Sequence, residues 1–385
     1  MTDNQLRVAL LAGGLTQGGA EKQLTYMAKA LLGSGVDVRI YGLTQGDYYQ
    51  DLLAENAVPY EWVGSQPGQI QRSQTIYRRL KQYQPHIVQS THFFTNLYAA
   101  IAGRLTGAVT IGSIRSNVYR EVKANGMWGP WLLRLPKFLI LNSEMARSNA
   151  LASGLKESRL FVLPNVIDLD DFDRQIQPIV QSPPSGDQNV VVMTVARFVK
   201  AKRLEHFLTA LARARSQNHN LRVVIAGDGP ERESLEKAAH LEGLLPGGVE
   251  FLGMRSDIPA LLSGADFFAI SSEIEGFPNA ILEAMAARLP VITTPAGDAA
   301  HIVQHGITGY VVPHNNPDAL AEKMVLLASS PELRQRFGAA GRDRVQRTYS
   351  YQSLAAQLIS IYKQAAALQH HTRALAALKP ENLTI

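Results

Sequence analysis

Two carboxylates in the second half of the chain stand at a spacing that suits a long polar ligand. Glu275 lies in the polar segment 271–279, and Glu283 lies in the Ala-rich stretch 280–287. Because 280–287 is predicted to be helical, we expect Glu283 inside a helix and Glu275 in the loop before it. One acid could then bind a sugar and the other a ribose. A solvated acid on a helix face is the alternative.

Two cations, Arg197 and Lys202, suggest a phosphate site in the same half of the chain. They stand five positions apart, between the apolar run 190–195 and a stretch of helical spacing at 203–215. A guanidinium can bind two phosphate oxygens, and an ammonium acts as a point charge. The pair could therefore face a pyrophosphate at a helix start, with an ordinary surface pair as the alternative.

A glycine-rich segment at 13–19 follows the first apolar run and ends in Gly18 and Gly19. It lacks the Lys-Ser/Thr pair of a Walker A loop and does not match the Gly-x-Gly-x-x-Gly dinucleotide pattern. Arg39 and Tyr41 also occupy the place where an NAD site needs an acid. A glycine turn that opens a helix can direct backbone N–H groups at a phosphate, but a plain structural turn is equally compatible.

A basic window at 62–160 suggests an anionic partner. It holds thirteen Lys or Arg residues and three Asp or Glu residues, a local charge of +10 in a chain whose net charge is +5. Within it, the segment 126–137 sets Trp128 and Trp131 among leucines and cations. This segment could enter an anionic membrane surface. The alternatives are an ordinary buried helix and, for the whole window, solvated surface charge.

Short apolar runs that alternate with helical stretches must position these residues, and they predict parallel α/β sheets with right-handed crossovers. Strands are expected at 6–12, 36–42, 86–90, 109–114, 138–142, 160–163, 190–195, 221–226, 249–252, 266–270, 290–293 and 309–312. Helices are expected at 20–33, 203–215, 231–242 and 280–287. The segment 176–188, rich in Pro, Gln and Ser, is predicted to be a linker between two doubly wound domains.

The composition narrows the class of protein. With 385 residues, 46% apolar and 18% charged, the chain suits two globular domains. The absence of cysteine excludes disulfides, thiolate catalysis and cysteine metal sites. No apolar run reaches the roughly 18 residues of a membrane span, and the first residues suit a strand better than a signal peptide. We therefore expect a cytoplasmic protein, and no nucleic-acid motif points to a nucleic-acid partner.

Taken together, the motifs resemble those of the retaining glycosyltransferases of sequence family four, and the resemblance extends over nearly the whole chain. They are Gly-Gly-Ala-Glu-Lys at 18–22, Leu-Pro-Asn-Val-Ile-Asp at 163–168, Arg197 with Lys202, Ala-Gly-Asp-Gly-Pro at 226–230, Glu-Gly-Phe-Pro-Asn-Ala-Ile-Leu-Glu at 275–283, Leu-Pro-Val-Ile at 289–292 and Gly-Ile-Thr-Gly at 306–309.

The resemblance implies a GT-B fold, in which two Rossmann-like parallel-sheet domains face each other across a cleft. The first, acceptor-side domain would comprise 1–175 and about 355–385, because the family returns its last helix to that domain. The second, nucleotide-sugar-binding domain would comprise 189–354. The tail from His370 onward is weakly patterned, and we expect it to fray.

The resemblance also implies roles for particular residues. Arg197 and Lys202 would neutralise the donor pyrophosphate, Glu275 would bind hydroxyls of the donor sugar, and Glu283 would bind the ribose. The remaining donor-binding residues would be Gly18, Gly19, Gly229, Phe277, Pro278 and Asn279. No metal and no cofactor are implied, since the two cations supply the positive charge.

On the acceptor side the match to the family is less regular. His92 is the candidate for a histidine near the reacting sugar, although Thr91 stands where that residue aligns. Arg115, Asn117 and Trp128 are candidates for acceptor contacts, and Arg115 could instead face the donor phosphate. His301 occupies a position where relatives often carry Glu, a change that would alter either the choice of sugar or only a contact behind the sugar site.

The sequence thus favours transfer of a sugar from a nucleoside-diphosphate sugar, UDP rather than GDP, to a hydroxyl of a glycan or lipid-linked acceptor. The reaction would proceed with retention and without metal, in polysaccharide or glycolipid biosynthesis, at the inner face of the membrane if the tryptophans bind it. Two alternatives remain: a nucleotide-sugar 2-epimerase or hydrolase on the same fold, and a non-enzymatic binder of anionic glycans.

Overall fold

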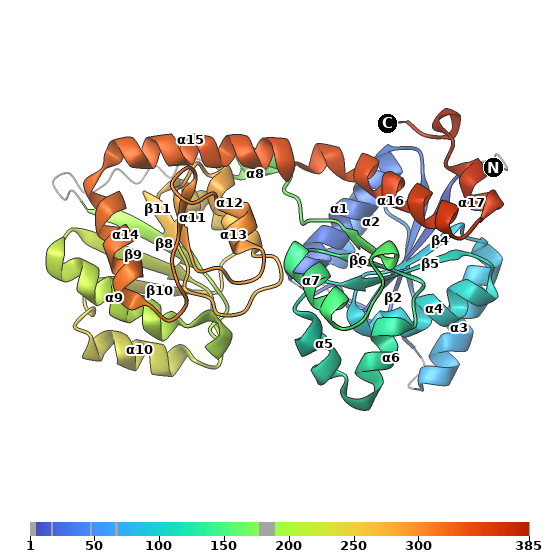
Figure 1. The fold of residues 1–385 in the computed structure, drawn as a ribbon, viewed down its shortest axis with the longest axis horizontal. Coiled ribbons are helices and arrows are strands. Elements are labelled where there is room, and N and C mark those ends of the chain that lie inside the picture. Colours follow the sequence, from blue (N-terminus) through green and yellow to red (C-terminus); the bar gives the residue numbers. More distant parts are fainter. Residues whose placement is uncertain (1–4, 17, 47, 66–67, 177–188, 385) are drawn as a thin grey trace. The chain divides into compact units, whose positions relative to one another are not determined.

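The computed structural model describes residues 5–384 except 17, 47, 66–67 and 177–188. The chain forms two compact units: unit 1 comprises Met1–Val166 and Tyr351–Ile385, and unit 2 comprises Ile167–Ser350. Each unit is an α/β structure built on one parallel sheet (Figure 1).

Unit 1 contains a seven-stranded parallel sheet in the order β3-β2-β1-β4-β5-β6-β7. Its strands are β1 (Arg7–Ala12), β2 (Asp37–Gly42), β3 (Tyr60–Trp62), β4 (Ile87–Ser90), β5 (Val109–Ile114), β6 (Phe138–Leu141) and β7 (Leu160–Val162). The central strands β4, β5 and β6 are buried along their whole length, and their polar side chains, such as Gln89 and Thr110, are buried with the apolar ones. The edge strand β3 was not predicted, because its three residues are only partly buried and too few for a pattern.

Helices cover both faces of the unit 1 sheet (Figure 1). One face packs against α1 (Gly19–Gly33), α2 (Tyr48–Glu55), α16 (Leu354–Leu368) and α17 (Thr372–Ala377). The other packs against α3 (Gln69–Tyr83), α4 (Asn96–Leu105), α5 (Val118–Ala124), α6 (Gly129–Arg134) and α7 (Glu144–Ala152). Short 3₁₀ turns η1 (Phe93–Thr95) and η2 (Gly126–Trp128) precede α4 and α6.

The C-terminal helices are part of the core of unit 1. Leu358 of α16 is completely buried with α1, and the hydroxyl of Tyr362 donates to Oε1 of Gln89 on β4 at 2.7 Å. The expectation that the tail frays from His370 is wrong for α17, because Ala374 and Ala377 of that helix are buried in the same core. These small side chains give little hydrophobic signal in the sequence.

Unit 2 contains a six-stranded parallel sheet in the order β10-β9-β8-β11-β12-β13. Its strands are β8 (Val190–Val195), β9 (Leu221–Ala226), β10 (Val249–Gly253), β11 (Phe267–Ala269), β12 (Val291–Thr293) and β13 (Gly309–Val311). Its helices are α8 (Leu169–Gln175), α9 (Leu204–Gln217), α10 (Arg232–Leu241), α11 (Ile258–Ser263), α12 (Asn279–Ala286), α13 (Ala299–Ile302), α14 (Pro317–Ser329) and α15 (Pro331–Thr348). Two apolar cores lie on the two faces of the sheet.

The boundaries between the units differ from those expected at 175 and about 355. Helix α8 belongs to unit 2, because Phe172 is buried in the core of that unit and Asp173 pairs with both terminal nitrogens of Arg342 at 2.6 and 2.8 Å. The change back to unit 1 comes at Tyr351. The predicted linker 176–188 lies, apart from Ile176, outside the described residues.

Each sheet has one place where the chain reverses its direction of travel across the strands. In unit 1 this switch point lies between β1 and β4, and in unit 2 it lies between β8 and β11. Loops leave the carboxyl ends of these strand pairs in opposite directions, so ligands of open α/β sheets bind there. No helix among the described residues combines the length and apolar character that a membrane span needs.

We expect removal of side-chain volume at the α1–α16 contact to destabilise unit 1. Leu358→Ala should lower its unfolding free energy by about 2–5 kcal/mol, because a buried leucine leaves a cavity. Leu368→Ala, at a half-exposed position of the same helix, should change it by less than about 0.5 kcal/mol. Native-state hydrogen exchange of amides in β1 and β4 measures unit 1 alone. Similar losses in both variants would contradict this packing.

Candidate functional site

The unit 2 switch point is bridged by an ion pair between two predicted site residues. Nζ of Lys202, which follows β8, lies 2.5 Å from Oε1 of Glu275, which follows β11. The hydroxyl of Ser272 donates to the same carboxylate oxygen at 2.7 Å. The side chains of Lys202 and Glu275 are only 22% and 12% exposed, so the pair is well shielded. Glu275 therefore has a fixed orientation before any ligand binds.

Further bonds hold the two loops of this bridge together. The hydroxyl of Ser271 donates to the carbonyl oxygens of Lys202 and Arg203 at 3.0 and 2.8 Å. The backbone N–H of Glu273 donates to the carbonyl of Ala201 at 2.9 Å. The Glu273 carboxylate also accepts two bonds from the Arg203 guanidinium, at 2.6 and 2.7 Å. The loop 271–276 is thus attached to the segment 200–203 at several points.

Arg197 differs from Lys202 in being exposed. Within the part of the chain that the structure describes, no carboxylate lies at ion-pair distance from it. The turn after β9 lies close to the backbone of Phe198, the residue after Arg197. Glycine permits this approach, since a Cβ at Gly229 would lie 2.5 Å from the carbonyl oxygen of Phe198. Arg197 therefore offers a free guanidinium at the same edge of the sheet as Lys202 and Glu275.

Helix α12 begins at Asn279, directly after the loop that carries Glu275. The ring of Phe277 is buried against Tyr349, with ring centroids 5.8 Å apart, and this contact fixes the loop where it enters the helix. Pro278 is the N-cap residue, and Glu283 is half-buried within α12. The helix start and the two carboxylates thus lie in one continuous stretch, as the sequence predicted.

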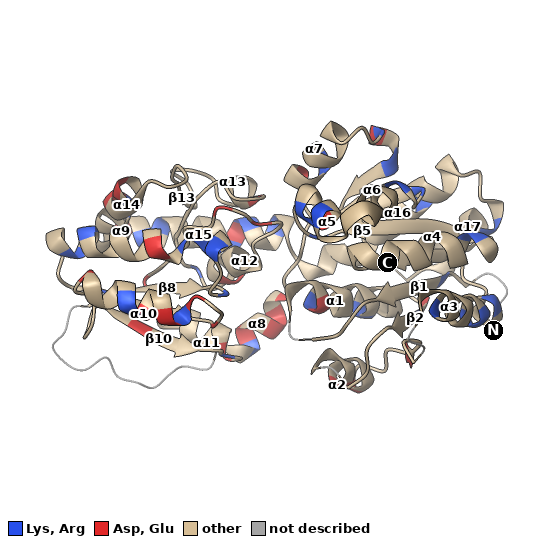
Figure 2. Ribbon diagram, turned by 90° about the horizontal axis from the view of Figure 1, so that it is seen from below, with Lys and Arg blue, Asp and Glu red and all other residues tan. Residues whose placement is uncertain are grey.

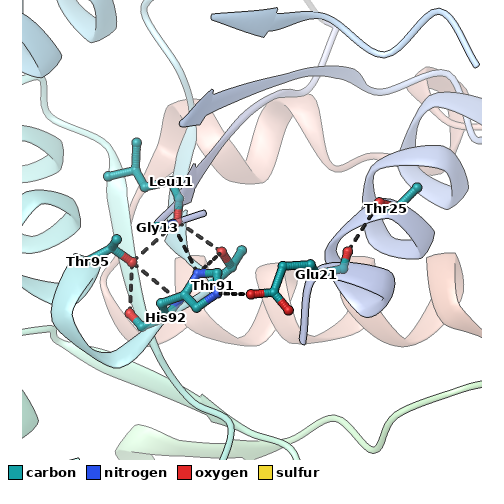
Figure 3. Close-up of polar contacts among 7 residues, drawn as sticks. All are labelled: Leu11, Gly13, Glu21, Thr25, Thr91, His92 and Thr95. Carbon is teal, nitrogen blue, oxygen red and sulfur yellow. Dashed lines mark hydrogen bonds and ion pairs between the residues drawn. The ribbon is translucent and has the colours of Figure 1, made fainter. Parts of the chain in front are cut away.

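The unit 1 switch point is bridged by His92, which follows β4 (Figure 3). Nδ1 of His92 accepts the backbone N–H of Gly13, which follows β1, at 3.0 Å. Nε2 lies 3.2 Å from Oε1 of Glu21 in the first turn of α1. Because Nδ1 is an acceptor, Nε2 carries the proton and donates to Glu21.

The loop that carries His92 is fixed by two threonines (Figure 3). The hydroxyl of Thr91 donates to the carbonyl of Leu11 at 3.1 Å, and that of Thr95 donates to the carbonyl of His92 at 2.8 Å. Thr91, the position at which the family's histidine was expected, is buried and its hydroxyl bonds to the end of β1. His92 is the residue that reaches the helix α1.

Arg115 lies after β5 and bonds to the segment 163–168, with Nη2 donating to Oδ1 of Asn165 at 2.6 Å. Burial lowers the pKa of Arg115 to about 10, and the nearby charge of Glu21 opposes this shift. Its Nε has no partner among the described residues. Arg115, Glu21 and His92 are therefore electrostatic neighbours in unit 1.

The other predicted acceptor residues have different surroundings. Oδ1 of Asn117 accepts the backbone N–H of Arg120 at 3.2 Å, so Asn117 caps α5. Trp128 lies on η2 and is 68% exposed. Gly18 is the N-cap of α1, and Gly19 is its first residue, which leaves the first backbone N–H groups of that helix without intrahelical partners.

The loop that contains His301 packs against the loop of Glu275. Gly297 adopts φ 57°, and a Cβ there would lie 2.4 Å from the carbonyl oxygen of Gly276. The same carbonyl accepts the backbone N–H of Asp298 at 3.2 Å. The His301 side chain is 61% exposed, with Nδ1 3.7 Å from Oδ1 of Asp298.

The sequence reasoning missed the residues that orient others. Glu21 belongs to a quoted motif but was given no role, and Ser272 and Asn165 were not singled out. Their partners lie far away in the sequence or in another loop, and spacing alone does not reveal such contacts. Among the residues that the structure describes, no group of three His, Asp or Glu side chains is arranged to hold a metal ion.

Two family models match this chain in succession. The model described as Glycosyltransferase Family 4 matches residues 17–171, and the one described as Glycosyl transferases group 1 matches residues 175–344. The chain belongs to the family four, group 1 glycosyltransferases, and its two parallel-sheet units have the GT-B fold.

The chain is only distantly related to the individual curated proteins that it matches. The chain is 27% identical over 194 residues to N-acetyl-alpha-D-glucosaminyl L-malate synthase of Bacillus anthracis, with 50% of each chain covered. It is 31% identical over 227 residues to the GDP-mannose-dependent alpha-(1-6)-phosphatidylinositol monomannoside mannosyltransferase of Mycobacterium tuberculosis, covering 56% of this chain and 59% of that one. The matched segments thus span about half the length of these curated relatives.

Among solved structures, HepE of Anabaena in complex with UDP and glucose superimposes with a TM-score of 0.81. The sequence identity is 20%, and the match covers 93% of this chain and 99% of that one. This similarity establishes the fold.

We expect the close approach at Gly297 to control the loop of Glu275. Gly297→Ala should lower the unfolding free energy by more than the roughly 1–2 kcal/mol of an αL alanine, because its Cβ meets a backbone oxygen. Gly306→Ala is the matched control, since Gly306 has φ 76° and nothing within 4 Å of the added Cβ. Urea unfolding gives the stabilities, and hydrogen exchange at 273–276 should accelerate only in Gly297→Ala. Equal behaviour of the two variants would refute the contact.

Proposed function

We propose that the protein is a retaining, metal-independent glycosyltransferase that moves a sugar from a nucleoside-diphosphate sugar to an acceptor hydroxyl. The proposal depends chiefly on one observation: Glu275 is held by Lys202 and Ser272 at the switch point of unit 2, where the exposed Arg197 also follows β8. A fixed carboxylate suits sugar hydroxyls, and the cations suit a diphosphate.

The donor would bind along this edge of unit 2. Arg197 and Lys202 would bind the diphosphate oxygens, on which negative charge grows as the bond to the sugar breaks. Glu275 would bind sugar hydroxyls, and Glu283 would bind the ribose. The remaining donor contacts would come from Gly229, from Pro278 and from the backbone N–H groups of Phe277 and Asn279, and in unit 1 from those of Gly18 and Gly19.

Transfer with retention would follow a front-side path. The bond between the anomeric carbon and the diphosphate oxygen breaks, and its electron pair stays on the diphosphate. The acceptor oxygen bonds to the anomeric carbon on the same face, and its proton passes to the departing phosphate oxygen. The chain then needs neither a carboxylate nucleophile nor a metal ion, because its cations stabilise the leaving group.

In unit 1, we assign His92, Glu21 and Arg115 to the polar groups of the substrates. Both ring nitrogens of His92 are engaged, Nδ1 with Gly13 and Nε2 with Glu21, so its role near the reacting sugar is to orient the Glu21 carboxylate. Arg115 is a buried cation with an unpaired Nε, which suits an anionic or hydroxyl-rich group. Asn117 and Trp128 remain proposed acceptor contacts.

We propose the classes of donor and acceptor from two similar proteins. HepE binds UDP, which favours a UDP-sugar, while the mycobacterial relative is GDP-mannose-dependent and acts on a phosphatidylinositol mannoside. We propose a glycan or lipid-linked acceptor in polysaccharide or glycolipid biosynthesis, met by a cytoplasmic enzyme at the inner face of the membrane. A nucleotide-sugar 2-epimerase or hydrolase would use the same donor contacts without an acceptor.

We predict that Arg197→Ala slows transfer about 100-fold or more while the protein stays folded, because Arg197 is exposed and supports charge that grows on the leaving phosphate. Lys200→Ala, which removes a neighbouring exposed cation, is the control and should transfer at the normal rate. Release of UDP or GDP from a panel of their sugars, with and without glycan and lipid acceptors, measures turnover. A normal rate in Arg197→Ala would refute the assignment, and release that ignores acceptors would favour the hydrolase.

We predict different defects for the two acids. Glu275→Gln should abolish turnover while the free nucleoside diphosphate still binds, since Glu275 is assigned to the sugar. Glu283→Gln should weaken binding of the diphosphate itself, because a hydrogen bond from the ribose to a charged group is lost. Titration calorimetry with UDP and GDP separates the two roles. An equal loss of affinity in both variants would mean that they are misassigned.

A further inference from the structure

Three arginines of unit 1 meet at one short stretch of backbone: Arg104 and Arg159 donate to its carbonyl oxygens, and Arg134 belongs to it. Nη2 of Arg104 donates to the carbonyl of Leu135 at 2.8 Å, and Nη2 of Arg159 donates to the carbonyl of Arg134 at 2.8 Å. Arg134 itself donates to the carbonyl of Ser153 at 2.9 Å. Their bonds in this cluster therefore go to uncharged carbonyl oxygens.

The cluster is not neutralised by carboxylates. Of the three acids in the window 62–160, Glu144 and Glu157 pair with Arg147, and Glu121 accepts the hydroxyl of Ser116. None of the three arginines of the cluster forms an ion pair within the described part of the chain. Burial, and then repulsion by Arg104 and Arg134, lowers the pKa of Arg159. The site thus has an excess of positive charge that an anion would relieve.

A pocket of about 330 Å³ lies beside this cluster. It is lined by Arg104, Pro130, Trp131, Arg134 and Leu135. Two guanidinium groups and an apolar wall suit a ligand that joins an anionic group to an apolar part.

Large apolar side chains project into solvent next to the pocket. Met127, Trp128 and Trp131 are 83%, 68% and 69% exposed, while Leu132 and Leu133 of the same segment are buried. The alternative of an ordinary buried helix is therefore wrong for the tryptophans, since α6 buries only one side. Around α5, α6 and α7 basic residues outnumber acidic ones (Figure 2). Tryptophan beside basic residues is typical of surfaces that meet the membrane interface.

The pocket lies at the edge of the unit 1 sheet opposite to the candidate site. Arg104 ends α4 before β5, Leu135 precedes β6, and Arg159 precedes β7, so all three stand at the amino ends of strands. His92 and Arg115 instead follow the carboxyl ends of β4 and β5. Within unit 1, the pocket is therefore separate from His92 and Arg115.

We propose that this pocket binds the phosphate of an anionic membrane phospholipid, while Met127, Trp128 and Trp131 enter the apolar boundary of the bilayer. A bilayer surface offers phosphate and hydrocarbon together, as the arginine cluster and the exposed apolar side chains require. The inference rests on the membrane association proposed above and names its site, but it does not depend on the transfer reaction.

Vesicle sedimentation of the full chain tests the proposal. The protein should bind phosphatidylcholine vesicles that contain phosphatidylglycerol and should leave them at high salt, and it should bind pure phosphatidylcholine far more weakly. Arg104→Gln and Arg134→Gln should each weaken binding about fivefold, the factor that corresponds to about 1 kcal/mol per basic residue. Trp128→Ser with Trp131→Ser should weaken it further.

Matched controls distinguish this pocket from general attraction. Arg78→Gln removes an exposed charge of α3 in the same basic window, and Leu241→Ser removes an exposed leucine of unit 2; neither should change binding by more than twofold. Equal losses in Arg78→Gln and Arg134→Gln would overturn the proposal, as would equal binding to both kinds of vesicle. Self-association that the tryptophan variants abolish, with vesicle binding unchanged, would show that a second copy covers this surface.

Nucleoside diphosphate binding, measured on the same variants, separates this proposal from the proposed function. It should stay unchanged in all of them, because the pocket contains none of the residues assigned to the donor. Loss of vesicle binding with intact nucleotide binding supports the lipid site. Absence of nucleotide binding in the unaltered protein would count against the glycosyltransferase assignment only.

Discussion

The reversal of strand order in each sheet is the constraint on which the candidate sites depend. It separates the loops after β1 and β4 in unit 1, and those after β8 and β11 in unit 2, and so creates space at the sheet edge. In both units a charged or hydrogen-bonded pair spans this space: His92 with Gly13 and Glu21, and Lys202 with Glu275. The fold thus orients these polar groups, because each is held between two loops that leave the sheet in opposite directions.

Much of this architecture could be predicted from hydrophobic patterning. The apolar runs at 190–195 and 221–226 coincide with β8 and β9, in which only Arg222 is exposed. Parallel strands that are covered on both faces need a mostly apolar sequence. The edge strand Tyr60–Trp62 was not predicted, because it is short and partly exposed. Helix α17 was not predicted for a different reason. Its buried residues are alanines, and their burial depends on the close approach of neighbouring elements rather than on their own hydrophobicity.

The candidate site could be predicted in part for similar reasons. Lys202 and Glu275 stand in motifs whose residue types suggest phosphate and sugar binding, so spacing was informative. Glu21 was overlooked because its partner His92 comes from another strand end. Trp128 and Trp131 show the limit of periodicity: the same mixture of tryptophan and leucine fits a helix buried all round and a helix buried on one side. Only packing against α5, where Gly129 allows close contact, decides which side faces outward.

The discontinuity of unit 1 has a consequence for the order of events during synthesis. Its sheet and α1 are made first, but the helix that covers Leu24 and Leu31 of α1 begins only at Leu354, after all of unit 2 (Figure 1). Unit 2 is continuous in the chain and can fold as soon as it leaves the ribosome. The part translated first therefore keeps an apolar face of α1 uncovered until translation reaches α16.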